Sequence, residues 1–354
     1  MDMTFLQILW FTLIAVLFTG YFVLEGFDFG VGMNVLFLGK GDDERKSVML
    51  RTIGPVWDGN QVWLLVGGGA MFAAFPAWYA TLFSGFYLAL LAILVALIVR
   101  VCAFKYREKS DSPRWRKNWD LMHFIGGFFP SLLWGVAFAN IVQGVAINKQ
   151  GEVTTSLLGL LNPFGLLGGV VFVLLFWMHG TLYLAIKTEG QIREDANKLA
   201  GKLFIPVILG GAVFLVWAQL MFNGKALTWI PLVLAALALI ALVPLHAKKL
   251  EKASFWTSCF AIAMASAFLF GCLFPNVLPG NPDPSTSLTI AKASSTEYTL
   301  LVMTVATVLI LPFVLAYQIW AYWVFRDRVA DSSAPAENGL LLKAKEKIAQ
   351  NFSV

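Results

Sequence analysis

The stretch that decides the fold is Glu25-Gly-Phe-Asp-Phe-Gly30, which places two carboxylates inside a long apolar run. A second string, Trp57-Asp-Gly-Asn-Gln-Val-Trp63, brings a third carboxylate, Asp58, to the edge of the next apolar run. A charged side chain at the centre of a membrane span costs about 2.5 to 3.5 kcal/mol on insertion scales. Carboxylates kept at that cost usually have a function, so Glu25, Asp28 and Asp58 are the first candidate site residues.

The composition around these stretches is that of a membrane protein. The chain has 354 residues, of which 58% are hydrophobic and 13% charged, and its mean hydropathy is +0.74. A soluble domain is about one quarter charged, and several runs here reach the roughly 20 apolar residues that cross a bilayer. We therefore predict an all-α integral membrane protein. The first run follows an acidic Asp2 and lacks a small-residue cleavage site, so we expect a retained helix rather than a signal peptide.

Nine transmembrane helices are expected, arranged as two four-helix bundles plus one peripheral helix. They form one domain over residues 1–328. Residues 329–354 form a cytoplasmic tail, in which 340–352 have the spacing of a helix lying on the membrane face. No secondary structure is predicted for the loop 275–297, and Pro76 is expected to mark a tight turn. The predicted spans are residues 5–37, 60–76, 79–103, 121–146, 163–186, 203–222, 228–246, 255–274 and 298–325.

The loops between these spans alternate in charge. Odd-numbered loops carry several Lys and Arg residues, whereas even-numbered loops carry one or none. By the positive-inside rule, the N-terminus faces outward and the C-terminus faces the cytoplasm. Nine spans satisfy this parity, and eight or ten would break it. We therefore predict a multi-pass protein of the bacterial cytoplasmic (inner) membrane, and the net charge of +5 does not indicate nucleic acid as a partner.

The topology places the three carboxylates towards the cytoplasmic side. Glu25 and Asp28, spaced i,i+3, share one helix face, and the glycines that follow them let another helix approach closely. Two carboxylates that share a site of low dielectric constant can exchange protons. We therefore predict a proton path formed by Asp58, Glu25 and Asp28. The alternative is that one of these acids pairs with Arg51 or caps a helix.

The string around Asp58 combines polar and aromatic residues at the start of a predicted span. Asp58 or Asn60 is expected to be the N-cap of that helix. Trp57 and Trp63 suit an interfacial aromatic belt. The amides Asn60 and Gln61 between them predict a hydrogen-bonded cluster, with water as a further member.

Arg100 and His179 lie inside apolar runs, and each has two interpretations. Arg100 either snorkels to the nearby surface or serves a site. His179 is either a packed, hydrogen-bonded core residue or a ligand or proton carrier. A bis-His haem needs two ligands at one depth on facing helices, and no second His matches the depth of His179. The chain is therefore expected to ligate no haem and no metal, and to carry no redox centre of its own.

Five strings of this sequence resemble subunit II of the cytochrome bd-type quinol oxidases. Two of them are residues 25–32 and 57–63, of which the second is highly specific. The other three are Phe83-Ser-Gly-Phe-Tyr87, Gly135-Val-Ala-Phe-Ala-Asn-Ile-Val-Gln-Gly144 and Leu161-Asn-Pro-Phe-Gly165. The resemblance spans the chain from the first predicted helix to the ninth.

The resemblance implies a heterodimer with a larger subunit I that carries two haems b, one haem d and the quinol-oxidising loop. The complex would oxidise quinol outside, reduce O2 to water and take protons from the cytoplasm, which generates a proton-motive force without pumping. This chain would be the haem-free subunit that stabilises subunit I, with a structural quinone held in it. A small single-helix subunit stays open as a further partner.

The resemblance also bears on the acidic residues. The proton path of the family is thought to begin at acids that match Asp58 and Glu25. Well-known members carry Asp at the position of Glu25, so the carboxylate survives here with one more methylene and altered hydrogen-bond distances.

Two other classes of function stay open. A secondary transporter would explain polar residues within the membrane and an internal two-fold repeat, but it needs broken helices at the midplane. A purely structural scaffold would use its acidic residues for packing alone.

Overall fold

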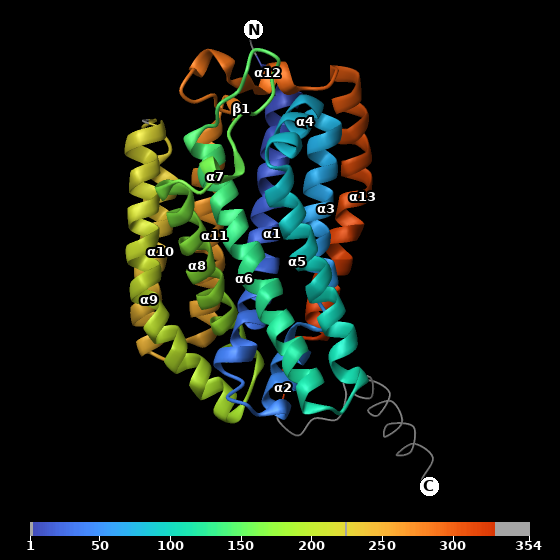
Figure 1. The fold of residues 1–354 in the computed structure, drawn as a ribbon, viewed down its shortest axis with the longest axis vertical. Coiled ribbons are helices and arrows are strands. Elements are labelled where there is room, and N and C mark those ends of the chain that lie inside the picture. Colours follow the sequence, from blue (N-terminus) through green and yellow to red (C-terminus); the bar gives the residue numbers. More distant parts are fainter. Residues whose placement is uncertain (1–2, 224, 330–354) are drawn as a thin grey trace.

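The computed structural model describes residues 3–223 and 225–329, and its long elements are helices that run along the long axis of the molecule (Figure 1). Helix α1 (Phe5–Phe37) lies at the centre. Its start is fixed by a capping box, in which Thr4 and Gln7 exchange side-chain and backbone hydrogen bonds. Helix α1 packs against α3 (Trp57–Ala74), α6 (Pro113–Gln143), α8 (Pro163–Lys187) and α11 (Glu251–Leu273). The predicted all-α class is confirmed.

The remaining long helices surround this centre. Helix α5 (Tyr87–Tyr106) packs on α6, and α9 (Gly190–Ala218) and α10 (Trp229–Ala247) lie on the opposite side, beyond α8 (Figure 1). Helix α13 (Glu297–Val324) lies at the edge beside α3, with Leu300 as its buried residue. Because α1 and α6 both pack on α8, the two predicted four-helix sets are in direct contact. Their division into two bundles stays a prediction.

Eight helices in the described part of the chain are long and apolar enough to cross a membrane. They correspond to all the predicted spans except residues 60–76. That segment is helix α3, which opens with the polar residues Asp58, Asn60 and Gln61 and is not among the eight. The count of nine spans therefore stays a prediction, which requires α3 to cross the membrane in addition to these eight helices.

The predicted third span, residues 79–103, is wrong at its start. Pro76 is the first residue of a separate short helix, α4 (Pro76–Gly85), and the break at Phe86 precedes α5. A Cβ at Gly85 would come within 2.4 Å of the Val153 side chain, so the loop after α6 presses on the backbone at this break. Apolar composition alone does not reveal such a contact.

The connections contain short elements. Helix α2 (Asp43–Ile53) follows α1, and α7 (Leu157–Leu160) precedes α8. The prediction of no secondary structure in residues 275–297 is wrong, because strands β1 (Asn276–Leu278) and β2 (Leu288–Thr289) pair antiparallel before α12 (Ile290–Ala293). This loop is held to the bundle, since Ser295 N donates to Ala74 O at 2.8 Å. The predicted helix at 340–352 lies outside the described residues.

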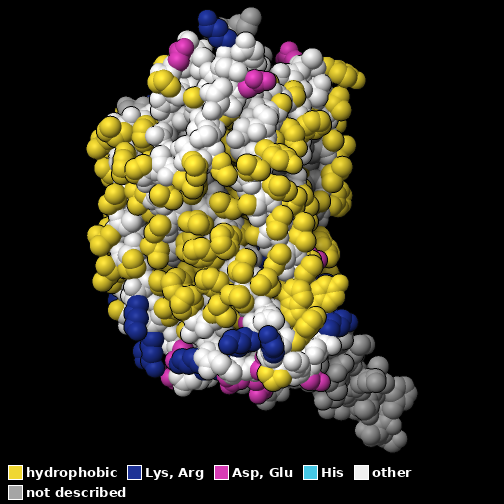
Figure 2. All heavy atoms as spheres, viewed as in Figure 1, with side chains coloured by type: hydrophobic (Ala, Val, Ile, Leu, Met, Phe, Trp, Pro, Cys, Tyr) yellow, Lys and Arg dark blue, Asp and Glu magenta, His cyan; other side chains and the backbone are white. Residues whose placement is uncertain are grey.

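The surface carries the pattern of a membrane protein. Figure 2 shows hydrophobic side chains over the middle of the molecule and most of the visible Lys and Arg side chains at the end that holds α2. We name this the α2 end. The prediction of a multi-pass membrane protein is confirmed by these apolar helices.

Candidate functional site

Three fully buried charges meet between α1 and α5, near the α2 end. Glu25 and Asp28 are 0% exposed and Arg100 is 1% exposed. Arg100 Nη1 donates to Glu25 Oε1, and Arg100 Nη2 lies 3.8 Å from Asp28 Oδ2. We name these three residues, with Asn60, the buried acid cluster. Its two carboxylates share one guanidinium, so one negative charge is left uncompensated when both acids are ionised.

Arg100 therefore does not snorkel to the surface. Its guanidinium carbon lies 5.0 Å from the centre of the Phe29 ring and 5.7 Å from that of Phe104. The carboxylates of α1 are close enough to hold it inside, and a buried cation is retained when it is paired in this way. The snorkelling interpretation of Arg100 is therefore wrong, and its role in a site stays a prediction.

Asn60 brings helix α3 into the cluster. Its Nδ2 donates to Asp28 Oδ2 at 2.8 Å and to Leu24 O at 3.3 Å. Its Oδ1 accepts a hydrogen bond from Tyr322 Oη at 2.6 Å and lies 3.4 Å from Gln318 Nε2. The predicted amide cluster is thus present for Asn60, and it extends to α13. Gln61 is half-buried one residue further along α3.

Gln318 and Tyr322 are residues that the sequence reasoning missed. They lie four residues apart on α13, so they share one helix face, and both reach Asn60. Gln318 Oε1 also lies 3.4 Å from Trp63 Nε1. Two polar residues at i,i+4 in an otherwise apolar span were the signal that could have found them.

Close helix packing holds the acids in place. A Cβ at Gly30 would lie 2.1 Å from Phe176 O, and a Cβ at Gly180 would lie 2.5 Å from the Gly30 backbone. Helices α1 and α8 therefore touch backbone to backbone just after the acids, which only glycine permits. A Cβ at Gly126 of α6 would lie 2.4 Å from Arg100 Cβ. The prediction that glycines allow close approach is confirmed.

Asp58 is not part of the buried cluster. It is exposed in the first turn of α3, where its Oδ1 accepts a hydrogen bond from Gly59 N at 2.8 Å. The predicted N-cap at Asp58 or Asn60 is wrong, because the helix already begins at Trp57 and its N-cap, Val56, makes no side-chain hydrogen bond. Trp57 stacks on Phe104, with ring centres 5.1 Å apart, and the guanidinium carbon of Arg100 lies 5.7 Å from the centre of the same Phe104 ring.

His179 is a hydrogen-bonded core residue. It is fully buried, its Nδ1 lies 2.7 Å from Ser258 Oγ and its Nε2 lies 3.0 Å from Val23 O. A carbonyl oxygen only accepts, so Nε2 carries a hydrogen. The Ser258 hydroxyl that contacts Nδ1 also donates to Phe255 O at 2.7 Å. No group of three or more potential metal-ligating side chains occurs within residues 3–223 and 225–329.

The buried acid cluster contains several polar atoms that have no hydrogen-bond partner in the described part of the chain. They are Glu25 Oε2, Asp28 Oδ1, and Nε and Nη2 of Arg100. Buried polar atoms are usually satisfied by protein or by ordered water. Donors and acceptors stand next to each other here, so bound water molecules would find partners on both sides. A cluster of two acids and water can bind and release a proton.

A large apolar cavity lies above the cluster, away from the α2 end. Its volume is about 540 Å³, and aromatic and aliphatic side chains of α1, α3, α4, α5, α6 and α11 line it. Trp78 lines this cavity, and its buried Nε1 has no partner among the described residues. Trp134 also lines it and donates to Tyr21 Oη at 3.2 Å, one helical turn from Glu25.

The comparisons with known proteins agree on one family. The family described as "Cytochrome bd terminal oxidase subunit II" matches residues 6–325. The chain is 40% identical to "Cytochrome bd ubiquinol oxidase subunit 2" of Bacillus subtilis, with 93% of this chain and 98% of that protein covered. It is 36% identical to "Cytochrome bd-I ubiquinol oxidase subunit 2" of Escherichia coli, with 93% and 96% covered.

A solved structure has the same fold. It is "The structure of bd oxidase from Geobacillus thermodenitrificans", with a TM-score of 0.75 at 17% identity, covering 91% of this chain and 99% of that one. The sequence relatives establish the family, and the structure supports the fold. The protein described here is part of an oxidoreductase complex, with a subunit I as its partner, and the chain belongs to the cytochrome bd terminal oxidase subunit II family.

Proposed function

We propose that this chain is the haem-free subunit of a quinol oxidase and that it supplies the complex with protons from the cytoplasm. Its subunit I partner would carry two haems b and one haem d, oxidise quinol outside and reduce O2 to water. Protons consumed inside and released outside generate a proton-motive force without pumping. The names of the relatives, which are ubiquinol oxidases, support this reaction.

The observation that carries the proton path is the buried acid cluster. Two carboxylates that face one guanidinium have one charge too many in a medium of low dielectric constant, and a shared proton removes it. Asp58 is exposed near the same end and is the first acceptor of the path. Asn60 links Asp28 to α3, the helix that carries Asp58. Protons would pass from Asp58 past Trp57 to the cluster through water.

The experiment uses the purified complex with Asp58→Asn, Glu25→Gln and Asp28→Asn, one at a time. We expect O2 consumption with reduced quinol to fall in each variant, by at least about tenfold for Glu25→Gln. Asp283→Asn is the matched control, because this exposed acid lies in the 275–297 loop at the opposite end. Wild-type turnover and haem content in all three variants would refute the proton path. Loss of haem would favour the scaffold interpretation instead.

The rival transporter interpretation makes a different demand. It needs substrate uptake by this chain in vesicles that lack the haem-bearing partner. The acids here lie towards one end and form an ion cluster with Arg100, rather than standing at a helix break at the midplane. These contacts favour the oxidase subunit.

We also propose the orientation that the loop charges predict, with the N-terminus outside, the C-terminus in the cytoplasm and the complex in the bacterial cytoplasmic membrane. The Lys and Arg residues seen at the α2 end support it (Figure 2). The α2 end would then be the cytoplasmic end, and the exposed Asp58 would take up protons from that side.

The structural quinone implied by the family fits the apolar cavity. A volume of about 540 Å³ is in the range of ligand sites, and the unpartnered Trp78 Nε1 would donate to a quinone carbonyl oxygen. Solvent extraction of the purified complex tests this assignment. Trp78→Phe should lower the quinone retained per haem, and unchanged retention would place the quinone elsewhere.

A further inference from the structure

His123 of α6 is a buried side chain that the proton path described above does not use. It is 0% exposed, and both ring nitrogens lack a protein partner among the described residues. The other two His residues differ from it, because His179 is hydrogen-bonded at both nitrogens and His246 is partly exposed. A buried imidazole with two unpaired nitrogens is costly unless water reaches it.

The packing of α5 on α6 places His123 between two groups of charges. The contacts form three successive levels. Residues 100, 104 and 107 follow one another along α5 and the turn after it, and they contact residues 126, 123 and 120 of α6, respectively. At the first level a Cβ at Gly126 would meet Arg100 Cβ at 2.4 Å. At the second, the rings of Phe104 and His123 lie 4.6 Å apart at 79°. At the third, Arg107 Nε donates to Asp120 at 2.7 Å.

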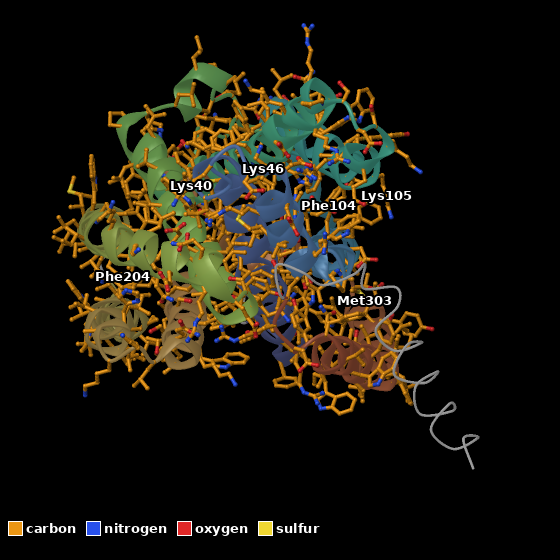
Figure 3. All side chains as sticks on the ribbon, turned by 90° about the horizontal axis from the view of Figure 1, so that it is seen from below. Lys40, Lys46, Phe104, Lys105, Phe204 and Met303 are labelled. Atoms are coloured by element: carbon orange, nitrogen blue, oxygen red, sulfur yellow. The ribbon has the colours of Figure 1, made fainter. Side chains whose placement is uncertain are left out.

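The third level connects to the surface of the α2 end. Arg107 and Asp120 are buried, yet Arg107 Nη2 donates to Asp43 at 2.6 Å, and the Asp43 side chain is 38% exposed. Lys46 Nζ donates to the second oxygen of Asp120 at 2.8 Å. In the view onto this end, Lys46 and Phe104 are both labelled (Figure 3). Polar groups therefore lead from the surface inward as far as Asp120.

The first level connects to the acids. Arg100 contacts Glu25, and the unpartnered Arg100 Nε and Nη2 and Glu25 Oε2 are buried there. His123 is thus the single imidazole between a network that opens on the surface and a cluster that binds a proton. Unsatisfied polar atoms of Arg100 and Glu25 occur on the acid side, whereas Arg107 and Asp120 on the other side are hydrogen-bonded to each other and to Asp43 and Lys46. A water molecule bound to each ring nitrogen of His123 would complete a hydrogen-bonded chain.

We propose that the juxtaposition of His123 with Arg107–Asp120 on one side and Arg100–Glu25 on the other forms a second proton route to the buried acids, parallel to the Asp58 route. The inference rests on the proposed function, because it needs Glu25 and Asp28 to be proton acceptors. A neutral imidazole can accept a proton at one nitrogen while it releases the proton of the other.

Two parallel routes have a kinetic signature that one serial route lacks. The proton-transfer rates of two parallel routes add, so a variant that blocks one route keeps the activity of the other. A variant that blocks both routes should retain less activity than the product of the fractions retained by the two single variants. The variants are His123→Phe, Asp58→Asn and their combination in the purified complex. His246→Phe is the matched control, because His246 also contacts a Phe ring edge to face, at 5.1 Å and 82°, but belongs to α10 and not to the contact between α5 and α6.

We expect each single variant to keep a measurable fraction of quinol-driven O2 consumption and the double variant to fall by about a hundredfold or more. Haem absorbance and the unfolding midpoint should stay unchanged in His123→Phe, because the removed nitrogens have no protein partner. His123→Gln, whose amide can also hold water, should restore part of the turnover in the Asp58→Asn background. If His123→Phe loses haem, the same comparison is made with His123→Leu.

The outcomes separate this inference from the proposed function. Unchanged turnover on adding His123→Phe to Asp58→Asn would overturn the second route while leaving the first in place. Complete loss of activity in Asp58→Asn alone would also overturn it, because only one route would then exist. Wild-type turnover in Glu25→Gln would refute the proposed function itself.

Discussion

Arg100 decides the electrostatics of the buried acid cluster, because its single positive charge faces two carboxylates. Glu25 takes the direct contact and Asp28 takes the longer one at 3.8 Å, with Asn60 as its second partner. Glu25 reaches the guanidinium of Arg100 directly, so the longer of the two acidic side chains makes the ion pair. The two acids are therefore chemically different, and Asp28 is the one that Asn60 connects to α3 and α13.

Removing the cation should be more harmful than removing one acid. We expect Arg100→Gln to destabilise the complex by about 3 to 5 kcal/mol, because it leaves the buried acid pair without its cation. The double variant Arg100→Gln, Glu25→Gln should be more stable than Arg100→Gln alone, since one of those charges is gone. Thermal unfolding of the purified complex measures both. Equal stability of the single and double variants would show that the cluster is not held by charge.

His179 and His123 are both buried histidines, but only His179 is hydrogen-bonded to protein in the described part of the chain. His179→Phe should destabilise the complex by about 1 to 3 kcal/mol, because the hydrogen bonds to Ser258 and Val23 O are lost inside the bundle. His123→Phe removes no hydrogen bond to protein and should not lower the unfolding midpoint. Unfolding curves recorded side by side test this difference. Equal losses in the two variants would contradict the assigned hydrogen bonds.

At the scale of elements, the contact between α1 and α8 fixes the depth of the acids. Gly30→Ala or Gly180→Ala would force the two backbones apart, since a Cβ at either glycine meets backbone atoms within 2.1 to 2.5 Å. We expect loss of assembled, haem-containing complex in both variants. Gly54→Ala at the end of α2 is the control, because a Cβ there makes only an ordinary contact, at 3.5 Å from Leu50 O. Normal haem yield in Gly180→Ala would contradict the backbone contact.

Helix α13 makes few contacts with the bundle, because Leu300 is the one buried residue along its length. Tyr322→Phe removes the hydroxyl that donates to Asn60 at 2.6 Å and should cost about 1 kcal/mol. It should also lower turnover, because Asn60 positions Asp28. Tyr317→Phe is the control on the same helix, since Tyr317 is exposed. Equal turnover in the two variants would show that the hydrogen bond from α13 to Asn60 does not contribute to activity.

For the whole molecule, apolar run length predicted most of the helices, because the cost of unpaired backbone groups in lipid leaves few alternatives. The same reasoning missed the break at Phe86 and the β1–β2 hairpin, which depend on contacts with distant loops. Glu25 and Asp28 could be paired from their spacing alone. Arg100, Gln318 and Tyr322 come from other helices, so their places in the cluster depend on helix packing that no local pattern encodes.

The orientation of the molecule in the membrane can be tested with two matched substitutions. Lys149→Cys lies in the loop after α6 and Lys248→Cys follows α10, and both side chains are exposed at opposite ends. The native cysteines give little background, because Cys259 and Cys272 are buried and Cys102 is only partly accessible. With a membrane-impermeant maleimide on intact cells, Lys149→Cys should be labelled and Lys248→Cys should react only after lysis. The opposite pattern would place Asp58 outside, where protons taken up for water formation would dissipate the gradient instead of building it.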